Sequence, residues 1–185
     1  RVQSHEPRLP APDAAAEDAG IRQFTYRTEN AGGAMADGYA RITHKVGVVT
    51  AQNGPAATLL VAPLAEALKS SVPIVALVQE VERSNLDRNA FQELDHIALF
   101  SGCAKWVRRV TEVARVEDYF DMAFAAATGG RPGPAVLLLP ADLLREPAAP
   151  DSGRRVSLGT YPLDRVAADP SRLDEAAELL ATARN

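Results

Sequence analysis

Apolar and polar positions along the chain follow two periods, one typical of amphipathic helices and the other of buried strands. Runs of aliphatic and β-branched residues such as PIVALV predict strands covered on both faces, as in a parallel sheet. Five strands are predicted, at residues 21–26, 45–50, 73–78, 104–110 and 135–139, with the remnant of a sixth at 1–2. Helices are predicted at residues 12–19, 30–41, 56–70 and 116–128. This alternation predicts an α/β fold with an open parallel sheet, flanked by helices on both faces through right-handed crossovers.

The pattern changes near residue 146 and divides the chain into a large domain, a linker and the start of a second domain. Residues 1–146 carry the alternating pattern. Residues 147–170 are rich in Pro, Asp and Arg without an apolar period, which predicts a linker. Residues 171–185 begin an amphipathic helix, with Ser171 as the expected N-cap. The chain opens on Arg1 and stops directly after this helix, so we expect a fragment cut at both ends from a longer polypeptide.

Composition excludes several classes of protein. Hydrophobic residues make up 46% of the chain and charged residues 24%, which is ordinary for a globular domain with a buried core. A formal net charge of −4, with the two signs interspersed, gives no surface for nucleic acid. No apolar run reaches the roughly 18 residues that a membrane span requires. The single cysteine, Cys103, excludes an intrachain disulfide, predicts a cytoplasmic location and is expected to be a small buried apolar residue.

Polar residues follow three of the predicted strands or open the next helix. Ligands of open α/β sheets bind beyond the carboxyl ends of the strands, where such residues meet. The three segments are residues 27–30, 52–55 and 88–93. We therefore expect a binding site at this edge of the sheet.

Five sequence blocks lie between residues 21 and 145. They are RTENAGGAMADGYARITHKVGVV, QNGPAATLLVAPLAEALKSSVPIVAL, RNAFQELD, AKWVRRV and GGRPGPAVLLLPADLL. In this order and spacing they resemble the acetolactate synthase-like family of thiamine diphosphate-dependent enzymes. The resemblance implies the thiamine diphosphate-binding fold and, within it, the N-terminal pyrimidine-binding domain. Residues 159–185 resemble the start of that family's central domain.

The resemblance implies that Glu29 binds the cofactor and is the catalytic carboxylate that activates it. In the family, a glutamate of the R-x-E segment hydrogen-bonds N1′ of the aminopyrimidine. A carboxylic acid at this position favours the imino tautomer, which removes the weakly acidic C2 proton of thiamine. The alternative is a carboxylate that only stabilises the start of a helix, worth under about 1 kcal/mol.

The Asn53-Gly54-Pro55 turn is expected to bind the cofactor. Gly54-Pro55 resembles the family's GPG turn, which lets the backbone approach the pyrimidine ring. Ala56 replaces the last glycine of that turn, and Leu59 stands where asparagine is usual. These two departures bear on the identity of the second substrate more than on the cofactor. The alternative is an ordinary turn before a helix.

Phe91 and Gln92, in the AFQE segment, resemble a family loop that reaches the reactive face of the cofactor from the neighbouring subunit. The resemblance implies that Gln92 is catalytic and donates to the carbonyl or carboxylate of a 2-oxo acid adduct. Phe91 is then a substrate contact. The alternative is a polar loop that faces water.

Two further residues are candidate substrate contacts. Lys105 stands where many relatives carry a lysine near the substrate channel, and the alternative is a strand-edge lysine whose amine reaches solvent. His5 lies where some relatives present a polar group to the substrate, and the alternative is an exposed loop histidine. His44 and His96 are assigned to the surface or to structure.

The resemblance implies thiamine diphosphate as the cofactor, with its diphosphate and Mg²⁺ held by a GDG motif in a different domain. No GDG motif occurs in this chain, so no metal ligand is expected here and the chain is expected to be inactive alone. The expected partner is the diphosphate-binding domain of a neighbouring subunit, in a homodimer or homotetramer. FAD, which some relatives retain as a structural cofactor, stays open.

The function implied by the resemblance is that of a lyase or transferase acting on a small molecule. The complete enzyme would decarboxylate or cleave a 2-oxo acid or acyl donor, and as a carboligase would join the product to an acceptor. One alternative is a separate-subunit pyrimidine-binding half, against which the linker and the helix after it argue. The other is a non-catalytic, doubly wound binding module, which predicts a GxGxxG turn that this sequence lacks.

Overall fold

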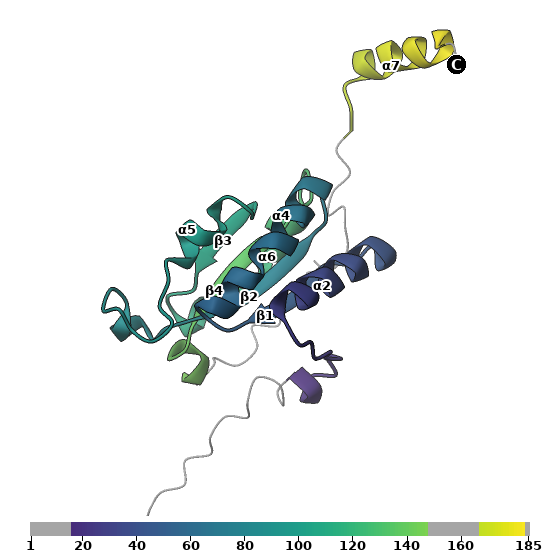
Figure 1. Ribbon diagram of the computed structural model, residues 1–185. Helices are drawn as coiled ribbons and strands as arrows, with labels where there is room; N and C mark the ends of the chain where they lie inside the picture. The colour runs from purple at the N-terminus through teal and green to yellow at the C-terminus, as the bar shows by residue number, and fades with distance from the viewer. Residues whose placement is uncertain (1–15, 148–166, 184–185) are drawn as a thin grey trace, which may run out of the picture.

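The computed structural model describes residues 16–147 and 167–183 (Figure 1). Several predictions lie outside the described residues: His5, the strand remnant at 1–2, the beginning of the helix at 12–19 and most of the linker. The domain boundaries at 146 and 170 therefore stay predictions. Within the described part, residues 16–18 are helical and the chain then turns at Ala19 and Gly20.

Four parallel strands form one open sheet. They are β1 (Gly47–Ala51), β2 (Ile74–Glu80), β3 (Trp106–Arg109) and β4 (Ala135–Pro140), in the spatial order β1-β2-β4-β3. All three pairings are parallel, with Val49 opposite Ala76 and Leu77 opposite Leu137. The predicted α/β fold with an open parallel sheet is confirmed.

Helices cover both faces of this sheet (Figure 1). They are α2 (Glu29–Thr43), α3 (Pro55–Leu59), α4 (Val61–Ser70), α5 (His96–Ser101) and α6 (Val116–Thr128), with short 3-10 turns at Arg83–Asn85, Val113–Arg115 and Leu143–Arg145. Helices α2, α4 and α5 pack on one face and α6 on the other. The connection from β3 to β4 runs back across the sheet, and a right-handed crossover then has to place its helix on the opposite face.

The core is divided by the alternation of side chains along the strands. Ile74, Ala76 and Val78 of β2 belong to the cluster formed with α2, α4 and α5, whereas Val75 packs with α6. The residues that α2 buries are all small: Gly32 lies against the Tyr26 ring, Gly33 against Pro63 of α4, and Ala36 and Ala40 in the core with the sheet. Small side chains let the helix backbone approach the strands closely. This approach sets the position of the residues at the N-terminal end of α2.

The segment at residues 21–26, predicted as a strand, is not one. It pairs with no other strand, and its apolar side chains Ile21 and Phe24 are each 61% exposed. A short apolar run is compatible with a strand only when a neighbour satisfies its backbone, and no neighbour does so among the described residues.

The predicted helix at 56–70 is two helices that meet at Leu60, which ends α3 and precedes α4. Pro63 explains the break, because proline has no N–H to donate to the carbonyl of Leu59 and its ring clashes with that carbonyl. The short helix α5 was not predicted, although Asp95 caps it by accepting from Ala98 N at 3.0 Å.

The helix near the C-terminal end, α7 (Pro170–Thr182), begins one residue before the expected N-cap. Asp169, not Ser171, caps it, and the carboxylate of Asp169 accepts from Ser171 N at 2.9 Å. Pro170 then takes the first helical position, where its missing N–H costs nothing. All residues of α7 are exposed, the leucines included.

Gly47 of β1 offers a test of the close contact between α2 and the sheet. A Cβ at Gly47 would lie 2.3 Å from the carbonyl oxygen of Ala36, so Gly47→Ala must push the helix backbone away. We expect this substitution to lower the free energy of unfolding by about 1–3 kcal/mol in urea denaturation. Gly38→Ala is the matched control on α2, since a Cβ there meets nothing within 4 Å. The control should gain about 0.5–1 kcal/mol, and equal losses in both variants would contradict the packing argument.

Candidate cofactor site

Glu29 is the first residue of α2 and lies at the carboxyl edge of the sheet. The helix begins here because Thr28 is extended and its Oγ1 accepts from Ala31 N at 3.4 Å. Glu29 is half-buried, so its carboxylate is fixed by the helix start and still accessible. The partial positive charge of a helix N-terminus favours a carboxylate at this place.

Tyr26 ties the start of α2 to the end of β1. Its hydroxyl donates to the carbonyl oxygen of Thr50, and its ring lies against Gly32, where a Cβ would be 2.6 Å from Tyr26 Cε1. Burial raises the pKa of Tyr26, and the negative charge of Glu29 raises it further, so the phenol stays a donor. This tie fixes Glu29 relative to the turn that follows β1.

The turn after β1 needs glycine at Gly54. Its φ of 64° and ψ of −126° belong to a conformation that other residues rarely adopt. A Cβ at Gly54 would lie 2.7 Å from Gln92 O and 2.8 Å from Gln92 Cβ, so the glycine also lets the loop after β2 touch the turn. Pro55 then takes the first position of α3.

The loop after β2 is held in an unusual conformation. Asp87, Asn89 and Gln92 have φ values of 62°, 52° and 61°. The carboxylate of Glu93 accepts from Asp87 N at 2.6 Å and from Ala90 N at 2.8 Å. These backbone hydrogen bonds, that of Ala90 first, hold the pKa of Glu93 below its ordinary value, so the loop is organised around an ionised carboxylate.

Asn53 joins this loop to the turn. Its Nδ2 donates to Gln92 O at 3.3 Å and makes a longer contact with Phe91 O at 3.5 Å. Phe91 is 85% exposed, whereas Gln92 is half-buried. The structure thus brings together Asn53, Gly54, Phe91 and Gln92, which come from two separate predicted segments.

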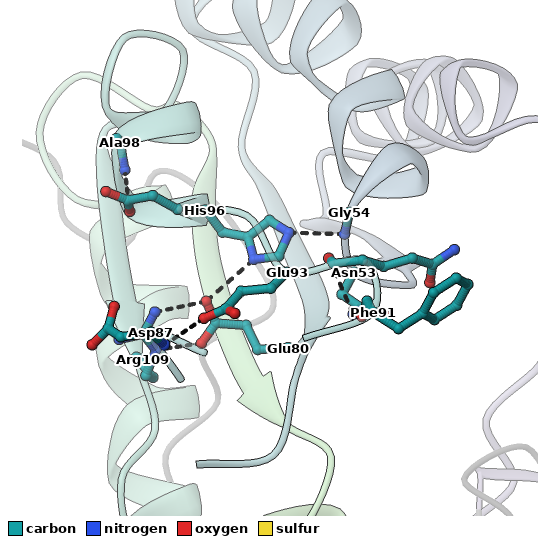
Figure 2. A network of polar contacts seen from close by, with 11 residues as sticks. Asn53, Gly54, Glu80, Asp87, Phe91, Glu93, His96, Ala98 and Arg109 are labelled. Atoms are coloured by element: carbon teal, nitrogen blue, oxygen red, sulfur yellow. Dashed lines mark hydrogen bonds and ion pairs between the residues drawn. The ribbon is translucent and has the colours of Figure 1, made fainter. Parts of the chain in front are cut away.

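A buried polar network supports this arrangement from beneath (Figure 2). Gly54 N donates to His96 Nε2 at 3.0 Å, and His96 Nδ1 lies 3.2 Å from Glu80 Oε1. Glu80 also accepts from Arg109 through both of its oxygens, with Arg109 Nη2 2.9 Å from Oε1. His96 is 1% exposed and Glu80 2%, so the assignment of His96 to structure agrees with its position.

Glu80 is an ionised carboxylate in the protein interior. Burial by itself would raise its pKa, but hydrogen bonds and positive charge from Arg109, with a hydrogen bond from His96, outweigh burial and lower the pKa. Sequence reasoning did not single out Glu80 or Arg109. The available signal was a carboxylate two residues after the PIVALV run, where a parallel strand ends.

Lys105 does not join these residues. It precedes β3 and therefore lies at the amino edge of the sheet, opposite the turn at Gly54. Its Nζ donates to Ala126 O at 2.6 Å and to Gly129 O at 2.5 Å, at the end of α6. The substrate contact assigned to Lys105 stays a prediction that the geometry of this chain does not support.

The positions of His44 and Cys103 agree with the structural roles expected for them. His44 ends α2 in the left-handed conformation, with its N–H on Ala40 O at 3.1 Å. Cys103 is free and buried, as expected. Among residues 16–147 and 167–183, no group of three His, Cys, Asp or Glu side chains could hold a metal ion. No helix of the described part has the length and apolar character that crossing a membrane requires.

The fold and this edge define a parallel α/β domain with a half-buried carboxylate at a helix start, which Tyr26 ties to the strand before a glycine turn. Residues 4–99 match the family model described as thiamine pyrophosphate enzyme, N-terminal TPP binding domain. The chain belongs to the thiamine pyrophosphate enzyme family and is a pyrimidine-binding domain related to acetolactate synthases.

Three relatives illustrate the relationship. A mitochondrial acetolactate synthase of Schizosaccharomyces pombe is 37% identical over 157 residues, which are 80% of this chain and 24% of the relative. The acetolactate synthase of Arthrospira platensis is 38% identical over 174 residues, 91% of this chain and 29% of the relative. A chloroplastic one of Arabidopsis thaliana is 34% identical over 173 residues, 92% of this chain and 26% of the relative. The chain thus spans between 24% and 29% of these relatives, and a cytoplasmic location stays a prediction.

The ionised state of Glu80 gives a pH-dependent prediction. Because its folded-state pKa lies below the ordinary 4.5, its contribution is present above pH 4.5 and is lost as the pH falls through the folded-state value. Glu80→Gln should therefore lower the free energy of unfolding by about 2–3 kcal/mol at pH 7 and by progressively less below pH 4.5. Urea denaturation over this pH range measures the difference.

Glu82→Gln is the control for that measurement. Glu82 pairs with Arg145 at 2.8 Å on the surface, where an ion pair contributes about 0–1 kcal/mol. A Glu80→Gln difference that stays constant between pH 7 and pH 3 would show that the pKa of Glu80 is the same in the folded and unfolded states, and a difference that grows as the pH falls would show that folding raises it.

Proposed function

We propose that this chain is the pyrimidine-binding part of a thiamine diphosphate-dependent enzyme in which Glu29 is the carboxylate at N1′ of the cofactor. The observation that carries the proposal is the position of Glu29, half-buried at the start of α2. Tyr26 anchors that position to the end of β1, directly before the glycine turn. The match to the N-terminal TPP binding domain supports the choice of cofactor.

The residues present fit a planar aminopyrimidine. Glu29 supplies a carboxyl group at the start of α2, and Tyr26 ties that start to the strand that precedes the Gly54 turn. Phe91 adds an exposed aromatic surface next to that turn. When bound, thiamine diphosphate supplies a carbon nucleophile at C2 that adds to a carbonyl group.

Three residues of this chain have distinct roles in the proposal. Glu29 holds a proton at its carboxyl group toward the ring nitrogen. The turn at Gly54 places backbone groups against the ring, and the side chain of Gln92 donates to the carbonyl or carboxylate of the substrate. Each role needs a fixed position, which the hydrogen bonds of the turn and the loop provide.

The reaction class we propose is decarboxylation or cleavage of a 2-oxo acid or acyl donor, followed by ligation to an acceptor. Support comes from relatives named acetolactate synthase at 34–38% identity. In this proposal the diphosphate and Mg²⁺ are held by the diphosphate-binding domain of a neighbouring subunit in a homodimer or homotetramer. FAD stays an open prediction.

Replacement of Glu29 tests the proposal at its central residue. Glu29→Gln in the complete enzyme should slow exchange of the cofactor C2 proton with deuterium by orders of magnitude, because the amide cannot carry the carboxyl proton. Acid quenching followed by proton NMR of the cofactor measures this rate. Circular dichroism of the variant should match that of the parent, because the substitution is isosteric.

Glu117→Gln is the matched control, since Glu117 occupies the first turn of α6 as Glu29 does in α2. Both substitutions should cost under about 1 kcal/mol of stability through the helix dipole. Only Glu29→Gln should change the exchange rate. An unchanged rate of C2 proton exchange in Glu29→Gln would mean that Glu29 only stabilises the start of α2.

Native mass spectrometry of the endogenous protein that contains this sequence separates the three functional hypotheses. We expect a polypeptide several times longer than 185 residues, in dimers or tetramers, with one thiamine diphosphate per chain. A chain of this size that carries the cofactor only with a second polypeptide would indicate a separate-subunit half. A chain of this size without cofactor or partner would indicate a binding module.

A further inference from the structure

One chain of buried hydrogen bonds connects the ends of three strands. Arg109 ends β3, Glu80 ends β2, and Gly54 follows β1. His96, the first residue of α5, lies between Glu80 and Gly54 and contacts both through its two ring nitrogens (Figure 2). The four residues therefore couple the turn after β1 to the end of β3, the strand at the opposite edge of the sheet.

The hydrogen-bond donors around His96 define which of its two ring nitrogens carries the proton. A backbone N–H can only donate, so Nε2, which faces Gly54 N, has to carry the lone pair. The ring proton is then on Nδ1 and is donated to Glu80 Oε1. Arg109 completes the arrangement by keeping the carboxylate charged and oriented. A single orientation of the imidazole satisfies both of its contacts.

The N–H of Gly54 is the point at which this series of hydrogen bonds reaches the candidate cofactor site. Gly54 is buried, and a buried N–H without an acceptor is costly. Gly54 and its neighbour Asn53 also contact the loop that carries Phe91 and Gln92. A displacement of the Gly54 amide would therefore move both the turn and the loop.

We propose that His96 is a positioning residue of the cofactor site, which holds the Gly54 turn through Nε2 while Glu80, itself held by Arg109, fixes the ring through Nδ1. The inference rests on the proposed function, because it assigns to the turn a role in binding the pyrimidine. His96 contacts the turn and acts on the cofactor only through it.

A pair of amide substitutions separates the two sides of the ring. In His96→Gln the side-chain carbonyl takes the place of Nε2 and keeps the acceptor for Gly54 N. In His96→Asn the shorter amide takes the place of Nδ1, so it keeps the bond to Glu80 and leaves Gly54 N without an acceptor. Both variants are polar and fill most of the same space, so folding is retained better than with an apolar residue.

The first readout is hydrogen–deuterium exchange at Gly54 in the complete protein, by mass spectrometry of overlapping peptides. Pro55 has no amide hydrogen, which helps to isolate the Gly54 signal. We expect His96→Asn to speed exchange at Gly54 about tenfold and His96→Gln to stay within about threefold of the parent. Equal exchange in the parent and His96→Asn would overturn the inference. If His96→Asn does not fold, loss of protection in His96→Gln would also overturn it.

The second readout is the apparent Kd for thiamine diphosphate, titrated into the apo-protein with Mg²⁺. We expect weaker binding in His96→Asn, by about tenfold, and near-parent binding in His96→Gln. The control is His44→Asn, an exposed position at the end of α2 whose left-handed backbone suits asparagine. Faster exchange at Gly54 with an unchanged Kd would overturn the role in cofactor binding and leave the proposed function standing. A parent protein that binds no thiamine diphosphate would instead refute the proposed function, while the exchange data still test the tie to Gly54.

Discussion

The arrangement of the carboxyl edge depends on one buried, ionised carboxylate, that of Glu80. An isolated carboxylate in a protein interior costs several kcal/mol, so its position is tolerated only where partners surround it. Arg109 supplies the compensating charge while remaining 27% exposed, so part of the guanidinium stays solvated. His96 uses the remaining capacity of Oε1. Because these partners come from different elements, the ends of β2 and β3 and the start of α5 cannot shift independently.

The loop beside this network stores strain that its hydrogen bonds offset. Asp87 and Asn89 tolerate a left-handed backbone because their short polar side chains can hydrogen-bond locally, but Gln92 has a longer side chain without this advantage and still adopts a φ of 61°. Such a conformation costs about 1–3 kcal/mol and persists only when the surroundings determine it. Glu93 and Asn53 supply those surroundings through bonds to the loop backbone. The strain thus falls on Gln92, the residue with a proposed substrate role, and backbone strain in proteins is concentrated at functional sites.

Sequence reasoning recovered the parts of the fold that periodicity dictates. Apolar and β-branched runs located β1, β2 and β4, and the rule that ligands bind at carboxyl ends led to Asn53 and Gln92, which the structure joins by a hydrogen bond. It failed at residues 21–26, where an apolar run has no strand to pair with, and at Leu60, where Pro63 outweighs helical periodicity. The network of Glu80, His96 and Arg109 escaped prediction because its members are 16 and 29 residues apart from Glu80 and no local pattern links them.

Ala56 and Leu59 depart from the family pattern in their side chains, whereas the turn beside them is defined by backbone groups. Both residues lie on α3, which begins at the Gly54 turn. The contacts that define the turn use the Gly54 amide, the Gly54 backbone angles and the Gln92 backbone, none of which depends on the side chains at 56 and 59. Leu59 is 43% exposed, so on the proposed function its side chain is accessible to a second substrate. On the proposed function, sequence change on α3 alters the choice of acceptor and leaves cofactor binding intact, because cofactor binding uses the Gly54 turn before the helix and the acceptor meets side chains on the helix itself.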